Sequence, residues 1–381
     1  MKKSTVSLGL AAAFVATLGT GPAVAQFGRL NDLANKAAKV KKIADLKVTD
    51  AEERQIGQAV SDRIVETFGV YQDVAVTKYV TLVGAVLAQS SSRPGLDWQF
   101  VVLDTEGVNA FAAPGGFIHI TKGLLGLMKN EAELAGVLAH EVTHVTEKHT
   151  VNAMQKGDTV KVASDEIGSS GGMTQGLIAR LAEQAYSDIL NNKFSRDDEG
   201  EADDTGVQLA NKVGYAPNGL ATALTKLADR NKATQEPNGL FASHPQIKDR
   251  LAKIDGLIKE KKLTATATVQ ARYAKNITFD AKPASAIATV AEGSRGLAGG
   301  EEKKPADGQA AEKKDEPKKS GGMFSKLRPG GGSQAQQSQT VASAGARGVN
   351  PDRDAVGGPN KTRVPVKIGP GEMAEFQKGI A

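Results

Sequence analysis

The sequence predicts a predominantly helical α+β fold with a small β-sheet at the edge of a cleft. Apolar residues make up 40% of the 381 residues and charged residues 24%, close to the values of globular domains. From residue 49 to residue 258, most apolar residues recur three or four positions apart, which is the spacing of amphipathic helices. Extended stretches are expected only in shorter segments, which is why the sheet should be small.

The predicted helices have recognisable starting points. Thr49 and Asn130 each stand just before a helix, with Glu52 and Glu133 three positions later, which is the pattern of a capping box. In chain order, helices are predicted at residues 49–67, 74–90, 130–149, 174–191, 195–212, 217–230 and 245–258.

The predicted strands lie between and after these helices. One is expected at 98–103, and two extended stretches are expected within 109–121, on either side of Pro114-Gly115-Gly116. The β-branched residues of 263–279 suggest one or two further short strands. The Gly- and Ser-rich residues 167–172 are interpreted as a flexible connector or, alternatively, as part of a lid over the cleft.

Residues 1–25 have the pattern of a secretory signal peptide. Lys2 and Lys3 precede an apolar run from Leu8 to Leu18, and Ala23-Val24-Ala25 is typical of a signal cleavage site. An uncleaved membrane anchor is the alternative, but the apolar run is shorter than the roughly 20 residues that span a bilayer. We therefore expect export to a bacterial periplasm. The absence of cysteine fits that compartment and is equally compatible with secretion to the medium.

The rest of the chain divides by composition. Residues 26–48 are predicted to form a basic amphipathic helix that packs on its own domain or, alternatively, makes peripheral membrane contact through residues 27–46. The main domain is expected at 49–260, followed by an extension with short strands at 261–293. Residues 294–381 contain few large apolar side chains, so we predict a low-complexity, disordered tail.

The helix predicted from Asn130 carries a candidate metal site. His140 and His144 are four positions apart and share one helical face, so both rings can reach one ion at about 2.0–2.1 Å. Glu141 lies beside the apolar stripe, where a carboxylate is costly unless a partner such as a dication with its water stabilises it. The segment reads H-E-x-x-H, in which the glutamate is the general base of zinc proteases. A polar surface helix is the alternative for this motif alone.

A catalytic zinc needs a third protein ligand and one open position. Glu199 and Asp203, again four apart, can supply a ligand and an acceptor for a ring N–H of His140. Gly206 on the same helix would let a neighbouring helix come close. Six acidic residues between 197 and 204 make a solvated acidic helix the alternative.

Together these motifs resemble the zinc metallopeptidase family of HtpX and the CAAX prenyl proteases. The resemblance covers roughly residues 45–260. It rests on four motifs in consistent order: H-E-x-x-H at 140–144, E-x-E-A-D at 199–203, Asn109-Ala-Phe-Ala-Ala-Pro-Gly-Gly, and Ser243-His244-Pro245 followed by Arg250.

The resemblance implies a zincin-like (gluzincin) metallopeptidase domain. One Zn²⁺ is expected at His140, His144 and Glu199, with Glu141 as base and Asp203 behind the ligands. The hydrophobic spans of the integral-membrane members are absent, so prenylated substrates are not expected. Exported members that remove misfolded envelope proteins are the closer likeness.

The implied reaction is peptide-bond hydrolysis by a metal-activated water, with Glu141 moving the proton to the leaving amine. His244 and Arg250 are candidates for stabilising the oxyanion, although His-Pro followed by arginine is also an ordinary helix start. Alternatively, His244 occupies the open zinc position and keeps the enzyme latent. A periplasmic chaperone or assembly factor with a latent or structural zinc is the competing function, and Glu141 favours the enzyme because a closed zinc site gives it no task.

The expected substrates are unfolded or misassembled envelope proteins, of which an extended segment would pair beside the predicted strand 117–121. A plain core strand is the alternative for these residues. His119 and His149 are expected to be structural or exposed. The formal net charge of +5 is small, so no nucleic-acid partner is expected. The sequence does not indicate an oligomeric state.

Overall fold

The computed structural model describes residues 48–156, 172–190, 194–232, 247–283, 290–291, 340–341 and 359–380. These residues belong to one compact unit that spans Lys47–Ala381. The predicted signal peptide, nearly all of the predicted amphipathic helix, most of the predicted lid segment and His244 lie outside the described residues. Within the described ranges, no helix combines the length and the apolar character needed to cross a membrane.

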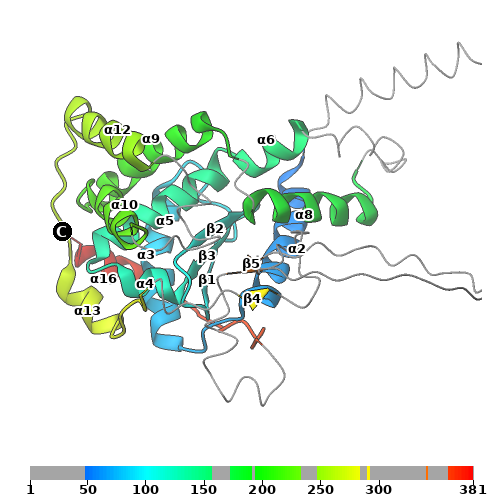
Figure 1. Ribbon diagram of the computed structural model, residues 1–381, viewed down its shortest axis with the longest axis horizontal. Helices are drawn as coiled ribbons and strands as arrows, with labels where there is room; N and C mark the ends of the chain where they lie inside the picture. Colours follow the sequence, from blue (N-terminus) through cyan, green and yellow to red (C-terminus); the bar gives the residue numbers. More distant parts are fainter. Residues whose placement is uncertain are drawn as a thin grey trace, which may run out of the picture. The chain divides into compact units, whose positions relative to one another are not determined.

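Helices dominate the described residues, which confirms the predicted fold class (Figure 1). The helices are α2 (Asp50–Phe68), α3 (Val74–Ser90), α4 (Lys122–Leu127), α5 (Glu131–Thr146), α6 (His149–Lys156), α8 (Gln175–Leu190), α9 (Arg196–Val213), α10 (Gly219–Arg230), α12 (Ile247–Glu260), α13 (Gln270–Asn276) and α16 (Pro370–Lys378). The strands are β1 (Gln99–Leu103), β2 (Ala110–Ala113), β3 (Phe117–Thr121) and the two-residue pair β4 (Val290–Ala291) and β5 (Thr340–Val341).

Two local predictions were wrong. The segment 263–279, expected to form strands, contains the helix α13 and a single backbone bridge between Ala267 and Tyr215. The predicted helix at 130–149 is interrupted, because α5 ends at Thr146 and α6 starts at His149. This interruption shapes the site described below.

The main sheet has the strand order β1-β3-β2, with β3 parallel to β1 and antiparallel to β2. Gly115 and Gly116 adopt φ values of 72° and 100°, so the tight turn between β2 and β3 uses conformations that favour glycine. Because β3 is paired on both sides, the expectation that a substrate pairs beside residues 117–121 was wrong. The edge strands of this sheet are β1 and β2.

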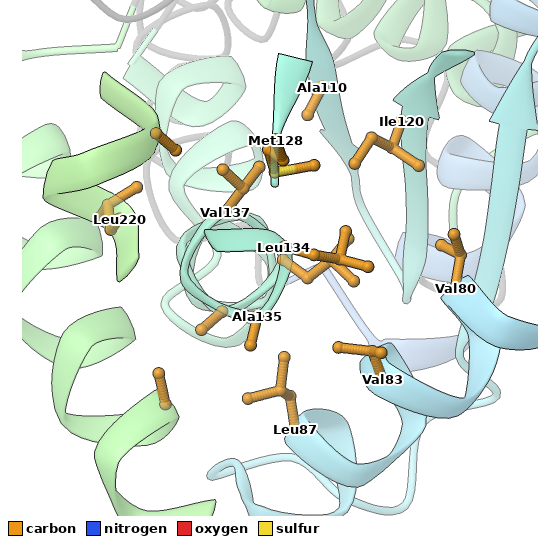
Figure 2. Close-up of a cluster of buried hydrophobic side chains, with 14 of the residues drawn as sticks. Val80, Val83, Leu87, Ala110, Ile120, Met128, Leu134, Ala135, Val137 and Leu220 are labelled. Carbon is orange, nitrogen blue, oxygen red and sulfur yellow. The ribbon is translucent and has the colours of Figure 1, made fainter. Parts of the chain in front are cut away.

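Helix α5 forms the centre of the core. All its residues from Glu131 to Val145 are buried. In Figure 2, α5 is seen nearly end-on, with Leu134 directed toward the sheet and α3, and with α10 on the opposite side. Such complete burial fixes the position of the helix, and therefore of the histidines that it carries, from several directions.

A buried carboxylate anchors the first turn of α5. Glu131 is 0% exposed and accepts hydrogen bonds from the hydroxyls of Tyr79 (2.8 Å) and Tyr215 (2.6 Å) and from Nε of Arg272 (2.7 Å). Burial, together with the charge of Glu131, raises the pKa of both tyrosines, so their hydroxyls remain donors. The start of α5 is thereby tied to α3, to the loop after α9 and to α13.

The C-terminal segment 359–380 packs on the domain. The carbonyl of Asn360 accepts a hydrogen bond from the backbone N–H of Val70 at 2.7 Å. Helix α16 follows, and Ile380, just after it, is 2% exposed and belongs to the core. The prediction of a disordered tail over 294–381 was therefore wrong for residues 359–380.

Helix α16 also reaches the anchor of α5. The guanidinium of Arg272 lies 3.9 Å from the centre of the Phe376 ring, and the Phe376 carbonyl accepts a hydrogen bond from it at 3.1 Å. The ring of Phe376 meets that of Tyr79 edge-on, with centroids 6.3 Å apart. Residues near the C-terminus thus complete the surroundings of Glu131.

We predict that Ile380→Ala lowers the free energy of unfolding by about 2 kcal/mol or more, because it removes a buried aliphatic side chain from the core. Urea denaturation of the protein measures this. Lys378→Ala is the matched control, because its side chain is 76% exposed and its loss should change stability by less than about 0.5 kcal/mol. Equal stability of the two variants would show that the segment does not pack as described.

His119 predicts a dependence of stability on pH. It is 0% exposed on β3, with Nε2 2.7 Å from the Ser61 hydroxyl. Burial, aided by the charge of Arg363, lowers its pKa to about 3. An unfolded chain protonates this ring near pH 6.5. Between about pH 3 and pH 6.5 the unfolded state therefore binds more protons, and this residue should destabilise the fold by about 1.4 kcal/mol for each pH unit below 6.5.

The check is urea unfolding at several pH values in the presence of a chelator, which keeps metal binding from contributing. His119→Gln should show a shallower loss of stability between pH 6.5 and pH 5 than the unmodified chain. Identical slopes would contradict the buried, neutral state of His119.

Candidate metal centre

The candidate site lies where α9 crosses α5. A Cβ atom on Gly206 would come within 2.9 Å of the backbone nitrogen of His140 and 3.0 Å of its Cα. Backbone atoms inside a packed helix cannot move aside cheaply, so this contact requires a residue without a side chain. The close approach predicted for Gly206 is confirmed, and it brings the acidic face of α9 onto the histidines of α5.

His140, His144 and Glu199 converge as the sequence predicts. The Nε2 atoms of the two histidines are 3.1 Å apart, and the carboxylate oxygens of Glu199 lie 3.7 Å from His140 Nε2 and 3.5 Å from His144 Nε2. An ion bound tetrahedrally at about 2.0–2.1 Å holds its ligand atoms about 3.3 Å apart. The three side chains are buried, and their ligand atoms all lie within 4.8 Å of one another. This geometry fits a single metal ion.

Asp203 determines which nitrogen of His140 faces the site. One of its oxygens lies 3.0 Å from Nδ1 of His140, so this nitrogen carries the hydrogen and Nε2 keeps its lone pair. A lone pair at Nε2, pointing at the Nε2 of His144 and at Glu199, is what a metal ligand requires. The distance fits the contact with a ring N–H of His140 that the four-residue spacing of Glu199 and Asp203 predicts.

Arg250 holds the carboxylates of α9 from the other side. Its Nε and one terminal nitrogen donate to the two oxygens of Asp203 at 2.8 and 2.7 Å, and another nitrogen lies 3.2 Å from Glu199. Burial opposes the charge of Asp203, but the hydrogen bonds of His140 and Arg250 outweigh it and keep the pKa of Asp203 well below its usual value. Likewise, burial opposes the charge of Arg250, and the acidic neighbours still raise its pKa. The predicted contact of Arg250 with an oxyanion stays a prediction.

The buried charges of the site are unequal. Glu141, Glu199 and Asp203 are 1%, 4% and 4% exposed, and Arg250 is 4% exposed. Counted as ionised, three carboxylates against one guanidinium leave two negative charges among these four residues. Buried charge is costly without compensation, and a divalent cation supplies that compensation. The charge balance therefore agrees with the geometry.

A cavity adjoins the candidate metal ligands. It has a volume of about 380 Å³ and lies between α9 and α12, with Glu199, Asp203 and Arg250 among its lining residues. Phe194 and Leu257 contribute apolar surface to it. The cavity provides room beside the site for a side chain of a bound molecule.

His149 was not predicted to belong to this site. The structure places its Nδ1 2.9 Å from Nδ1 of His144, and its side chain is 1% exposed. Positions five apart do not share a face of a continuous helix, so the sequence suggests no contact between these residues. Only the break between α5 and α6 brings the two rings together.

A model of peptidase family M48 matches residues 75–258, which include both helices of the site. Residues 75–258 form a peptidase family M48 domain. The M48 domain implies a metal cofactor, and His140, His144 and Glu199 fit one in distance, burial and charge.

Several curated proteins are similar in sequence to this chain. The chain is 26% identical over 253 residues to the beta-barrel assembly-enhancing protease of Escherichia coli K12, and the aligned region covers 64% of this chain and 50% of the relative. It is 33% identical over 159 residues to metalloprotease LoiP of the same organism, with 41% of this chain and 60% of the relative covered. It is 28% identical over 188 residues to the mitochondrial metalloendopeptidase OMA1 of Schizosaccharomyces pombe, with 48% of this chain and 53% of the relative covered. The chain spans about half the length of the beta-barrel assembly-enhancing proteases it matches.

We predict that Gly206→Ala weakens metal binding and destabilises the fold by about 1–3 kcal/mol, because the added methyl group forces α9 away from His140. This runs against the intrinsic helix preference, which favours Ala over Gly by about 1 kcal/mol. Gly200→Ala on the same helix is the matched control, because nothing lies within 4 Å of its added Cβ. Chelator competition and urea unfolding measure both effects, and equal behaviour of the two variants would contradict the close contact.

Proposed function

We propose that this chain is a zinc-dependent endopeptidase of the cell envelope that hydrolyses misfolded or misassembled proteins. The observation that supports it most directly is the convergence of two imidazoles and one carboxylate, from α5 and α9, on one point. The family match and the relatives named as metalloproteases agree with this chemistry. We further propose one Zn²⁺ per chain, because histidine nitrogens with one carboxylate form a typical catalytic zinc site.

The proposed ligands are His140, His144 and Glu199, with Asp203 orienting His140. A zinc ion held there supplies a Lewis acid and a bound water of lowered pKa. Glu141 follows His140 directly and is buried on the same helix, so we propose that its carboxylate takes the proton from the attacking water and delivers it to the leaving amine. Arg250 holds Asp203 and Glu199 in place, and it helps to keep the pKa of Asp203 low.

The substrate class is proposed from the relatives and from the sheet. Beta-barrel assembly-enhancing proteases suggest misassembled envelope proteins as substrates. An extended chain would pair with an edge strand, and β2, which packs against α5, replaces β3 as the proposed strand. Helix α8 also packs on β2 and would have to shift for such pairing. Export through the signal peptide at 1–25, and membrane contact through 27–46, remain proposals from the sequence.

The alternative, a chaperone or assembly factor with a latent or structural zinc, has no specific support among the described residues. A structural zinc site is closed by four protein ligands. The described site gathers three candidate ligands and places Glu141 beside them. This arrangement favours the enzyme.

We predict that Glu141→Gln lowers kcat on casein by at least about 100-fold, because the amide cannot accept the proton, while zinc content stays at one per chain. Glu147→Gln, the same change just beyond the end of α5, should leave both values unchanged. A peptidase assay with and without 1,10-phenanthroline, together with metal analysis, makes the comparison. Activity of the Glu141→Gln protein near the level of the control variant would exclude Glu141 as the base.

A further inference from the structure

We infer that His149 and Glu201 are positioning residues for the metal centre, because they hold His144 in the tautomer that presents Nε2 to the ion. The inference rests on the proposed metal site and extends it to a second histidine partner. His140 has its outer partner in Asp203, and the geometry assigns the corresponding place behind His144 to His149.

The hydrogen positions follow from the contacts. Nε2 of His149 lies 3.2 Å from a carboxylate oxygen of Glu201, which can only accept, so this nitrogen donates. In the neutral ring the other nitrogen, Nδ1, then carries a lone pair. It lies 2.9 Å from Nδ1 of His144, so His144 must donate there. His144 therefore keeps the lone pair of Nε2, the atom that faces His140 and Glu199.

The backbone is shaped to make this contact. On an uninterrupted α-helix, side chains five positions apart point about 140° away from each other. Here Lys148 adopts φ 57°, a left-handed conformation that is uncommon for a residue with a side chain. This turn ends α5 and starts α6 so that the ring of His149 comes back onto His144.

The unusual turn is held by ion pairs. The ammonium group of Lys148 lies 3.0 Å from Asp50 and 3.1 Å from Glu53, both on α2. Glu53 is fully buried and also binds Arg93 at 2.9 Å. A costly backbone conformation that the surroundings hold in place is a frequent mark of a functional position.

Phe194 closes the other side of the pair. Its ring stacks on that of His144 with centroids 4.4 Å apart, and it lies 6.3 Å from the ring of His149. His149 is 2% exposed, whereas the side chain of Glu201 is 54% exposed. The chain of hydrogen bonds therefore runs from an accessible carboxylate on α9, through one buried ring, to a proposed metal ligand.

The test compares zinc affinities of the full-length mature protein, measured by competition with a chromogenic chelator. His149→Leu replaces the ring by an apolar side chain of related size, which offers no acceptor to His144. The zinc affinity of this variant should fall about 10- to 100-fold. His149→Asn places an amide oxygen near the position of Nδ1, so it should restore affinity to within a few-fold of the unmodified protein. The absorption spectrum of the Co²⁺-substituted protein should change in the Leu variant and be retained in the Asn variant.

Two results would overturn the inference. One is unchanged zinc affinity in His149→Leu, and the other is equal loss in the Leu and Asn variants, which would show that the ring only fills space. If His149→Leu does not fold, Glu201→Ala replaces it, since this exposed residue can be removed without opening the core. Glu201→Ala should weaken zinc binding, and unchanged zinc affinity would refute the proposed chain of hydrogen bonds from Glu201 through His149 to His144. An unmodified protein that binds no metal would instead refute the proposed function itself.

Discussion

The contact between α9 and the backbone of His140 is the constraint on which the site depends. Gly206 lets the two helices approach until side chains from both meet at one point. Glu199 and Asp203 lie on α9 on the side of that contact, so a change of helix separation would move both together. A shift of about 1 Å is enough to lose metal geometry, because ligand distances vary by only about 0.2 Å. The position of a residue without a side chain therefore controls chemistry several residues away.

Helix α5 can serve as the reference for that contact because it is fixed on all sides. Its first turn is tied by the buried Glu131 to three other parts of the chain, and its length is surrounded by core residues. Removing one partner from such a buried, charged network costs about 3–5 kcal/mol. The histidines consequently project from a rigid support, against which the contact at Gly206 sets the position of α9.

Much of this arrangement follows from local sequence patterns. Spacing of three and four residues predicts the helices, and the capping residues Thr49 and Asn130 mark where two of them start, as observed. The same spacing pairs His140 with His144 and Glu199 with Asp203, because four positions are one turn whatever the rest of the fold does. The fold class and each of these two pairs could therefore be predicted from spacing, whereas the meeting of the pairs at one site was implied by the resemblance to a zinc metallopeptidase family.

What could not be predicted depends on long-range contacts or on single backbone angles. The strand order β1-β3-β2 is a tertiary property, so residues 117–121 were placed at an edge instead of the centre. The left-handed turn lies at Lys148 and not at a glycine or asparagine, so the sequence does not indicate it. For that reason the contact between His149 and His144 could not be predicted. Residues 359–380 have the composition of a disordered tail, and their order comes from the surface that the domain offers them.

The burial of Ile380 has a consequence for cuts in the chain between the domain and this residue. Helix α16 also touches Arg272, the partner of Glu131 at the start of α5, so the support of the candidate site's histidines includes residues far from them in the sequence. A cut between residues 283 and 359 that released the segment 359–380 would expose core surface and weaken the support of α5, although it would remove none of the candidate metal ligands.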